Sequence, residues 1–231
     1  MIKIWIKQKA LLLVIFLGIS LPAAVGAMGP GVLADKVQSS YEQTQDLKMD
    51  FVQDTYVEVL EQNVKKKGQA YFKKPGKFAI QYSGKRGREY ISDGKKLWIF
   101  KKGDRQVQLY SLVHEQIPAE ALSFLGGLGN LKRDFAVETV DPKKEKNLKI
   151  KKGDRKWLEL TPLKKRSQIQ WIVMGFDPQS YLAVEAYIFT ESGNVSHYTF
   201  SSLVPNTNLS EDLFLFKKKG VKEVKVKGLE H

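Results

Sequence analysis

The sequence predicts a mainly β domain of about ten or eleven antiparallel strands with little helix, closed as a wide barrel or a strongly curved half-barrel. Three observations predict this class. Apolar runs and period-two alternation recur between turn residues along most of the chain. Asp93-Gly94 lies between two such runs and suits a tight hairpin turn, because both residues tolerate positive φ angles. Apolar residues at helical spacing occur in only two short segments.

The N-terminal residues predict export. Lys3, Lys7 and Lys9 precede an apolar run over Ala10–Leu21, and Val25-Gly26-Ala27 offers the small residues that a signal peptidase recognises. The run has about 12 residues, whereas a membrane-spanning helix needs roughly 20. We expect residues 1–27 to be a signal peptide cleaved after about Ala27, which gives an exported, soluble protein. The alternative is an uncleaved membrane anchor.

Removal of residues 1–27 from the 231-residue chain leaves 204 residues, which suffices for one large β domain. We expect residues 28–228 to form that single domain, and residues 229–231 to be an expression-tag remnant. The chain contains no cysteine, which excludes both a disulfide framework and a lipid-bearing cysteine at the cleavage site.

The net charge is strongly positive. It is +13 for the whole chain and +10 without Lys3, Lys7 and Lys9 of the leader. The other lysines form short clusters beside glycine and proline, at expected strand ends and turns. Solvated loop charge accounts for this pattern, and a basic surface for anionic membranes or acidic partners is the alternative. Export and the scattered charge argue against nucleic acid as a partner.

The elements follow in order along the chain. Val32, Leu33, Val37 and Tyr41 recur at helical spacing and predict an amphipathic helix between Pro30-Gly31 and about Thr44. Strands are then predicted at Leu47–Leu60, Val64–Phe72 and Phe78–Tyr82, and in two consecutive hairpins between Tyr90 and Leu109.

The second half of the chain begins with a predicted short helix over Pro118–Leu125, since proline is favoured in a first helical turn. Gly126-Gly127-Leu128-Gly129 ends it, and no buried strand precedes these glycines as a phosphate loop would require. Further strands are predicted at Phe135–Val140, Trp157–Pro162, Ile169–Phe176, Tyr181–Phe189, Val195–Leu203 and Phe214–Phe216.

One predicted strand is apolar on both faces. Leu97-Trp98-Ile99-Phe100 places hydrophobic side chains on alternate sides, so neither face of this strand suits water alone. A sheet of this kind needs two apolar environments, and a ligand is a candidate for one of them.

Seven strings of residues, spread from about Val32 to Val224, form a recognisable series. They are Phe51-Val52-Gln53, Gly68–Phe78, Ser92–Phe100, Gln106-Val107, Trp157–Pro162, Gly193-Asn194 and Phe214–Val221. Each string alone is common, but their order and spacing together are specific. On these residues the chain resembles the LolA family of periplasmic outer-membrane lipoprotein carriers.

The resemblance implies an incomplete β-barrel, closed by an N-terminal helix and a short helical lid, with an apolar cavity for acyl chains. It implies acylated lipoproteins as cargo, an inner-membrane ATP-driven release complex and an outer-membrane acceptor as partners, and no cofactor or metal. We expect a monomer. Lys74 stands where the family usually has arginine at a lid latch, and lysine lacks the planar fork of arginine. Lys218-Lys219 also precedes Gly220 where the family tends to have prolines before the glycine.

Candidate cavity residues are the large apolar side chains of the predicted strands. They are Phe51, Tyr71, Phe78, Ile80, Trp98, Phe100, Leu158, Leu160, Trp171, Val173 and Met174. Ala121, Leu122 and Leu125 are the candidate lid residues, and Lys74 is the candidate latch. Each apolar residue could equally belong to an ordinary core, and strand parity could assign it to the wrong face.

Catalytic residues are not expected. Apart from the terminal tag, the chain has only His114 and His197, and it has no Gly-x-Ser-x-Gly elbow. Asp93 is accounted for by its turn, and Glu159 alternates outward from Leu158 and Leu160 as a solvated charge would. The sequence therefore predicts a carrier of lipoproteins. The alternatives are a carrier of another lipid and an exported sensor of lipoproteins on the same fold.

Overall fold

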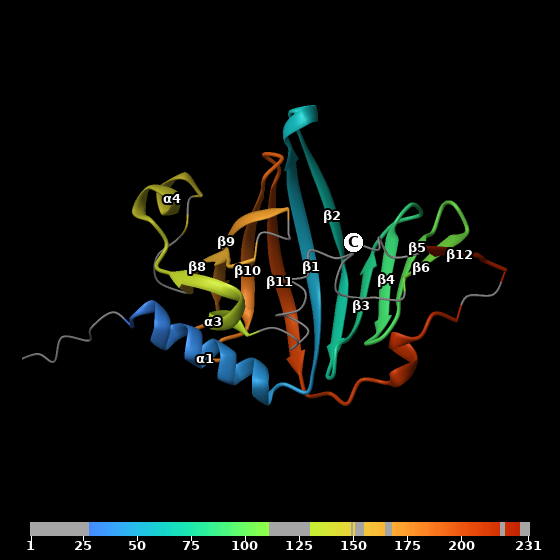
Figure 1. Cartoon of the computed structure of the whole chain (residues 1–231), viewed down its shortest axis with the longest axis horizontal. Helices are drawn as coiled ribbons and strands as arrows, with labels where there is room; N and C mark the ends of the chain where they lie inside the picture. Colours follow the sequence, from blue (N-terminus) through green and yellow to red (C-terminus); the bar gives the residue numbers. More distant parts are fainter. Residues whose placement is uncertain are drawn as a thin grey trace, which may run out of the picture.

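The computed structural model describes residues 28–110, 130–148, 150, 155–164, 168–217 and 220–226. These residues form one sheet of twelve strands (Figure 1), in the order β12-β6-β5-β4-β3-β2-β1-β11-β10-β9-β8-β7. The strands are β1 (Asp46–Val57), β2 (Gln62–Lys73), β3 (Lys77–Tyr82), β4 (Arg88–Asp93), β5 (Leu97–Lys101), β6 (Gln106–Tyr110), β7 (Phe135–Glu138), β8 (Lys156–Pro162), β9 (Ile169–Phe176), β10 (Ala183–Thr190), β11 (Val195–Pro205) and β12 (Lys222–Val226). The helices are α1 (Pro30–Gln43), α3 (Leu131–Asp134), α4 (Pro142–Asn147) and the 3-10 turns η1 (Glu58–Leu60) and η3 (Glu211–Phe214).

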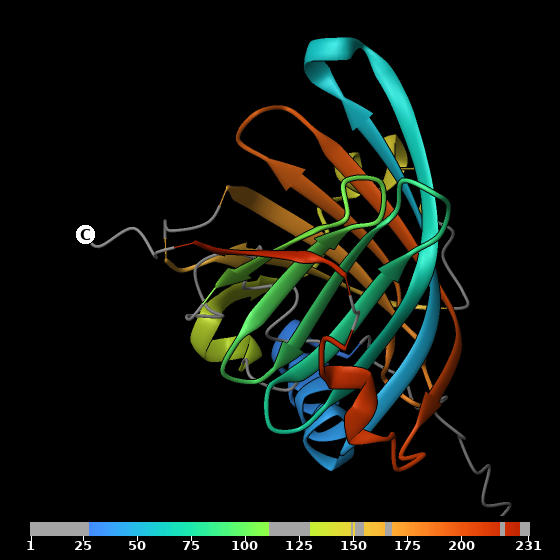
Figure 2. The ribbon, with the colours of Figure 1, turned by 90° about the vertical axis from the view of Figure 1, so that its right-hand side faces the viewer.

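The sheet is strongly curved and stays open. Figure 2 shows the strands wrapping around α1. Strands β7 and β12 form the two edges, and no pairing between described strands joins them. Every pairing is antiparallel except that of β12 with β6, which is parallel. The predicted half-open, mainly β barrel with helices is confirmed, and the expectation that all of its strands are antiparallel is wrong at β12.

Helix α1 begins and faces the sheet largely as its sequence predicts. Pro30 occupies the first turn, where its fixed φ suits the helix and its missing N–H costs nothing. Leu33, Val37 and Tyr41 are buried against the sheet, together with Ala34. Val32, which the helical spacing grouped with them, is 54% exposed, because it lies beyond the edge of the apolar stripe.

The turn at Asp93-Gly94 forms as expected, with a longer connection than a two-residue hairpin. Three residues separate β4 from β5. The Asp93 carboxylate accepts the backbone N–H groups of Lys95 and Lys96 at 2.8 and 2.7 Å, and Gly94 has φ +91°. Asp93 therefore has the role in the turn that the sequence predicted for it.

Two predicted strands differ from the structure, one in where it ends and one in whether it forms. The first strand ends at Val57 rather than Leu60, because residues 58–60 form η1 and Glu61 adopts the left-handed conformation (φ +48°). The strand predicted at Phe214–Phe216 is wrong. Its residues follow or end η3, in which Ser210 caps the N–H of Asp212 and Phe214 is buried, and the last strand comes later at β12.

Candidate functional site

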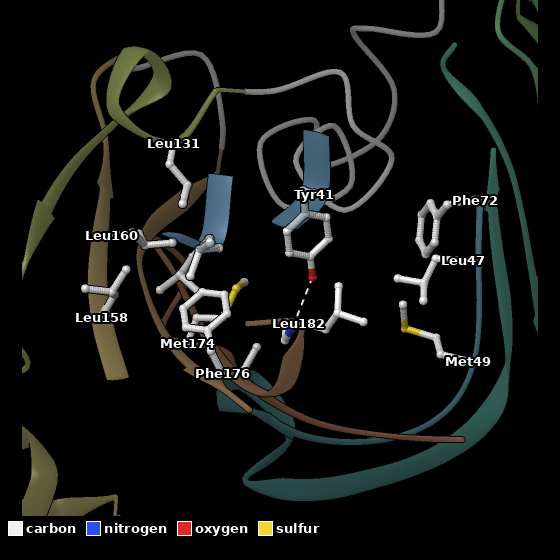
Figure 3. Packing of buried hydrophobic residues seen from close by; sticks show 14 of the residues in the cluster. Tyr41, Leu47, Met49, Phe72, Leu131, Leu158, Leu160, Met174, Phe176 and Leu182 are labelled. Carbon is white, nitrogen blue, oxygen red and sulfur yellow. Dashed lines mark hydrogen bonds between the residues drawn. The ribbon is translucent and has the colours of Figure 1, made fainter. Parts of the chain in front are cut away.

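The side of the sheet that α1 covers, here called the concave face, is apolar over nearly all strands. Side chains alternate between faces along each strand. Residues that pair directly across two strands point to the same face of the sheet. Phe51 pairs with Phe200, and Met174 pairs with both Leu158 and Ala186, so each of these groups shares one face. Figure 3 shows apolar side chains of the same face converging around Tyr41 of α1, with Leu158 and Met174 on one arm of the sheet and Met49 and Phe72 on the other. The buried cluster includes Leu47, Met49, Phe51, Phe72, Phe78, Ile80, Leu97, Leu158, Leu160, Ile172, Met174, Phe176 and Leu182.

Helix α1 makes a polar contact through Tyr41 within this cluster. The Tyr41 hydroxyl accepts the backbone N–H of Ala183 at 3.1 Å, so the ring is fixed between α1 and β10 (Figure 3). Tyr41 is 3% exposed, and burial raises its pKa above the ordinary value for tyrosine. The group therefore stays neutral at physiological pH, and the cluster gains no charge from it.

Lys74, the predicted latch, contacts the end of α1. Its ammonium group donates hydrogen bonds to the carbonyl oxygens of Tyr41 and Glu42, each at 2.7 Å. The last carbonyls of a helix have no partners within the helix, so a cation at this end satisfies them and complements the helix dipole. Burial lowers the pKa of Lys74, and the nearby Glu42 carboxylate partly opposes this shift. The contact predicted for a latch is present, and its role in lid movement remains a prediction.

The eleven candidate cavity residues divide between the two faces. Six share the concave face with α1, where the structure brings them into one buried cluster. They are Phe51, Phe78, Ile80, Leu158, Leu160 and Met174.

The other five lie on the convex face, so they cannot line the same cavity. Tyr71, Trp98, Phe100, Trp171 and Val173 have the opposite strand parity from their concave neighbours. Tyr71 and Trp98 pack beside Phe214 in a second cluster, and the ring of Phe100 is 5.5 Å from that of Phe216. Trp171 stacks on Phe189 at 3.5 Å. The strand that is apolar on both faces thus has protein on its convex side.

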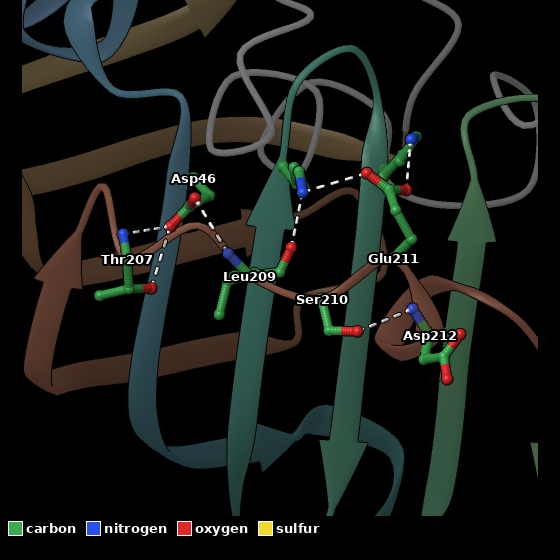
Figure 4. A network of polar contacts seen from close by, with 8 residues as sticks. Asp46, Thr207, Leu209, Ser210, Glu211 and Asp212 are labelled. Atoms are coloured by element: carbon green, nitrogen blue, oxygen red, sulfur yellow. Dashed lines mark hydrogen bonds and ion pairs between the residues drawn. The ribbon is translucent and has the colours of Figure 1, made fainter.

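The segment after β11 covers this convex face and is fixed by polar contacts (Figure 4). The Asp46 carboxylate accepts the N–H groups of Thr207 and Leu209 at 2.8 and 3.2 Å, and the Thr207 hydroxyl at 3.1 Å. Lys73 donates to the Leu209 carbonyl at 2.6 Å and pairs with Glu211 at 3.0 Å. Desolvation alone would raise the pKa of Asp46, but the hydrogen bonds from Thr207 and Leu209 outweigh it and lower the pKa.

Sequence reasoning missed several residues of the concave cluster. Leu47 and Met49 precede Phe51 at intervals of two, and Phe72 pairs with Leu47 across the hairpin. The parity of β1 and β2 was therefore sufficient to find all three. Tyr41, Ile172 and Phe176 also belong to the cluster.

The remaining candidates are placed as follows. Ala121, Leu122, Leu125 and His114 lie outside the described residues. Glu159, expected to be solvated, is 8% exposed and pairs with Lys144 of α4, which covers it on the convex face.

His197 is on the convex face, with its Nε2 2.7 Å from Glu185 and its ring stacked on Tyr187 at 4.2 Å. The described residues contain no group of three or more potential metal ligands. None of their helices is long and apolar enough to cross a bilayer.

Comparison with known proteins identifies the family. The family model described as outer membrane lipoprotein carrier protein LolA matches residues 42–217, which is more than half of the chain. The chain belongs to the LolA family. The resemblance drawn from the sequence is confirmed, and the matched range includes all the strands that build the concave face except β12.

Individual relatives are distant. An outer-membrane lipoprotein carrier protein of Cupriavidus necator is 30% identical over 149 residues, covering 64% of this chain and 65% of that protein. One from Nitrosospira multiformis is 24% identical over 149 residues, covering 64% and 67%. The chain thus spans about two thirds of the length of these LolA relatives. A crystal structure of an uncharacterized conserved protein from Thermus thermophilus has a TM-score of 0.53 at 12% identity, covering 85% of this chain and 98% of that one, and shows a shared fold.

Proposed function

We propose that the protein is a periplasmic carrier that shelters the acyl chains of lipoproteins against its concave face. It receives them from an inner-membrane ATP-driven release complex and delivers them to an acceptor at the outer membrane. The observation that supports this most directly is the apolar concave face of a LolA-family sheet, which α1 covers and whose edge strands β7 and β12 do not pair with each other in the described part of the chain.

The energetics of acyl chains require such a surface. Each methylene gains about 0.8 kcal/mol on leaving water, so two or three chains of about sixteen carbons represent tens of kcal/mol when fully sheltered. A carrier must cover them and still release them. Broad aliphatic and aromatic surfaces such as Phe78, Leu160 and Met174 suit both needs, because their contacts with acyl chains are non-directional and graded.

Cargo entry on this proposal requires α1 to move, since its side chains fill the space beneath it. Leu33, Val37 and Tyr41 are at most 4% exposed and pack on the residues that acyl chains would contact. Lys74 donates to carbonyls at the end of the helix, so release of these two bonds removes part of what holds that end of α1, together with the contacts of Ser40 and Tyr41. Return of the helix to the same contacts would displace cargo.

Extraction of the purified protein tests the class of cargo. The protein is purified from a Gram-negative periplasm and extracted with organic solvent, and the released material is identified by mass spectrometry. Acylated lipoprotein in about a one-to-one ratio is expected. Phospholipid alone would instead assign a general lipid carrier. A folded protein with no lipid, bound stably to a membrane regulatory protein, would instead assign a sensor.

Photocrosslinking from matched positions tests which face is used. Phe200 and Phe189 are both half-buried and lie on adjacent strands, but Phe200 is on the concave face and Phe189 on the convex face. A photoreactive phenylalanine analogue at Phe200 is expected to crosslink to acyl-labelled lipoprotein, and the same analogue at Phe189 is not. Equal crosslinking from both positions would contradict binding at the concave face.

A buried charge provides a second test. Phe78→Glu places a carboxylate among the concave apolar residues and is expected to abolish loading, because an unpaired charge beside acyl chains is costly. The convex substitution Trp98→Gln is the control. Normal loading by a stably folded Phe78→Glu protein would remove Phe78 from the site.

A further inference from the structure

The β1–β2 hairpin extends well beyond the strands on one side of it. Strand β3 accompanies β2 only as far as Gly68, which pairs with Tyr82, whereas β1 and β2 continue for six further residue pairs to Val57 and Gln62. On the other side, β11 follows β1 as far as Tyr56. The hairpin therefore ends in a projecting tip, visible at the top of Figure 1.

The tip presents aliphatic side chains to solvent. Val59 is 87% exposed and Leu60 is 58% exposed, both in η1, and Val64 on β2 is 37% exposed. Among the exposed large hydrophobic residues of the described chain, Val59 and Leu60 have the highest exposed fractions. Such a group on the most projecting part of a soluble protein indicates a surface for contact with an apolar partner.

The tip is anchored rather than frayed. The N–H of Glu58 donates to the Asn194 side chain at 2.9 Å, and the Glu58 side chain lies against Gly193 in the β10–β11 turn. This contact directs Glu58 towards the neighbouring turn and leaves Val59 and Leu60 at the end of the hairpin. The pair is thus held in place by backbone and side-chain contacts.

Positive charge surrounds the tip. Lys65, Lys66 and Lys67 lie on its β2 strand, and the β3–β4 turn at the same end of the sheet adds Lys85 and Arg86. Within the described residues, none of these five side chains is in an ion pair with a carboxylate, whereas Lys101 and Lys102 nearby are paired with Asp104 and Glu89. The other carboxylates described at this end of the sheet are Glu58 and Glu61 of the tip, Asp54 of β1 opposite Lys65, and Glu191 of the β10–β11 turn. Lys66 lies over the Tyr82 ring, with its Nζ 5.8 Å from the ring centre. The five cations outnumber these four carboxylates, and Lys65 and Lys67 share the convex face.

We propose that this tip, defined as residues 58–67, docks on an anionic lipid bilayer. Val59 and Leu60 enter the headgroup region, and Lys65 and Lys67 contact the phosphates of acidic lipids. The charge pattern of the sequence left open whether the basic residues serve a membrane surface or only solubility. Aliphatic residues beside lysines that form no ion pair within the described residues favour a membrane, since both attractions act at the same bilayer interface. Lysines along the free edge of β2 also disfavour pairing with a strand of a second copy.

Vesicle flotation tests the proposal with the purified protein free of cargo. Binding is compared on vesicles of equal parts phosphatidylcholine and phosphatidylglycerol and on vesicles of phosphatidylcholine alone. The expected partition coefficient is at least about tenfold higher on the acidic vesicles. The double variant Val59→Ser/Leu60→Ser is expected to lower it about tenfold. Val32→Ser/Leu163→Ser, at positions 54% and 57% exposed elsewhere, is expected to leave it unchanged.

The charge is tested in the same way. Lys65→Gln/Lys67→Gln is expected to lower binding to acidic vesicles at least about tenfold. Lys95→Gln/Lys96→Gln, an exposed pair at the opposite end of the sheet, is the control. A Leu60→Trp protein is expected to show blue-shifted emission and quenching by brominated lipid, and Leu163→Trp is not.

Several results would overturn the proposal. They are the absence of binding to acidic vesicles, equal binding to neutral vesicles, wild-type binding by the tip variants, or an unshifted Leu60→Trp spectrum. A concentration-dependent dimer that the tip substitutions abolish would assign the tip to a second copy instead. Because the vesicles contain no lipoprotein, failure here leaves the carrier proposal intact, and failure of the carrier proposal leaves this one intact.

Discussion

Lys73 and Lys74 are neighbours at the end of β2, and they hold two different coverings of the same sheet. Lys73 points to the convex face, where it contacts Leu209 and Glu211 of the segment after β11. Lys74 contacts the last carbonyls of α1, which covers the concave face. One β-strand thus connects the two coverings through side chains on opposite sides.

The two coverings are held by different kinds of contact. The convex covering has a buried carboxylate, Asp46, with three donors, and a carboxylate at Glu211 shared by two lysines. The buried side of α1 packs through apolar side chains and through the hydrogen bond that the Ala183 N–H donates to Tyr41. Its outer side adds an ion pair of Asp35 with Lys132 and a hydrogen bond from Ser40 to the Ser180 carbonyl. The two coverings therefore differ mainly in what is buried beneath them, which is a hydrogen-bonded carboxylate on the convex side and an apolar cluster on the concave side. Only the apolar contacts are of the kind that acyl chains can also make.

The largest expected effect comes from the convex covering. Phe214 is 1% exposed and anchors the segment beside Ala79 and Ile91. Phe214→Ala is expected to lower the free energy of unfolding by about 3–5 kcal/mol, measured by urea denaturation. Leu215→Ala, at a neighbouring position that is 41% exposed, is the control and is expected to change it by less than about 1 kcal/mol. Equal effects would show that the covering does not depend on Phe214.

Asp46→Ala tests the polar part of the same covering. The substitution leaves the N–H groups of Thr207 and Leu209 without their acceptor and is expected to cost about 3 kcal/mol in the free energy of unfolding. Asp212→Ala removes only an exposed ion pair with Lys217, so a change below about 1 kcal/mol is expected there. A similar small change in both variants would mean that water replaces the Asp46 contacts.

As the pH falls, the segment that covers the convex face is expected to lose its contacts at a higher pH than α1 does. The pKa values of Asp46 and Glu211 are lowered in the folded protein, the latter by hydrogen bonds from Lys77 and Lys73. A carboxyl group whose pKa is lower in the folded protein stabilises the fold at pH values above the pKa of the unfolded chain, which is about 4. This stabilisation is lost as the pH falls through the pKa of the folded protein.

Hydrogen exchange followed as the pH is lowered below about 4 is therefore expected to show loss of protection at the N–H of Leu209. The N–H of Ala183, which donates to the neutral Tyr41 hydroxyl, is expected to stay protected. Simultaneous loss at both sites would show that the two coverings open together.

The smallest expected effect on stability belongs to Lys74. Burial lowers the pKa of this lysine, so desolvation offsets part of what its hydrogen bonds contribute. Lys74→Leu is expected to change the free energy of unfolding by no more than about 1 kcal/mol. The same protein is expected to load lipid but to pass it on more slowly, because the closed position of α1 is less favoured.

Transfer of labelled lipoprotein to acceptor vesicles measures that rate. Lys73→Leu, which alters the convex contacts alone, is the matched control and is expected to transfer cargo at the wild-type rate if it stays folded. Transfer by Lys74→Leu at the wild-type rate would mean that Lys74 is not a latch.

Local patterns were enough to predict much of this molecule. The spacing of Leu33, Val37 and Tyr41 predicted α1, and Asp93-Gly94 predicted a turn that forms through the Asp93 side chain. The order of the family strings predicted the half-open sheet and the contact of Lys74 with helix carbonyls. The helix and the turn depend on residues near one another in the chain, where periodicity and turn chemistry act, whereas the half-open sheet and the Lys74 contact followed from the family resemblance.

The face that each strand presents depended on tertiary structure. Trp98 and Phe78 are both large aromatic strand residues, yet one packs under the segment after β11 and the other under α1. Periodicity within a strand shows that two faces exist, but it does not say which distant segment covers each face. The parallel pairing of β12 with β6 likewise could not be predicted, because the pattern within a strand does not identify its distant partner. The sequence by itself therefore determined the sheet, the helix and the turns, whereas long-range packing decided which apolar residues face the proposed cargo and which are permanent core.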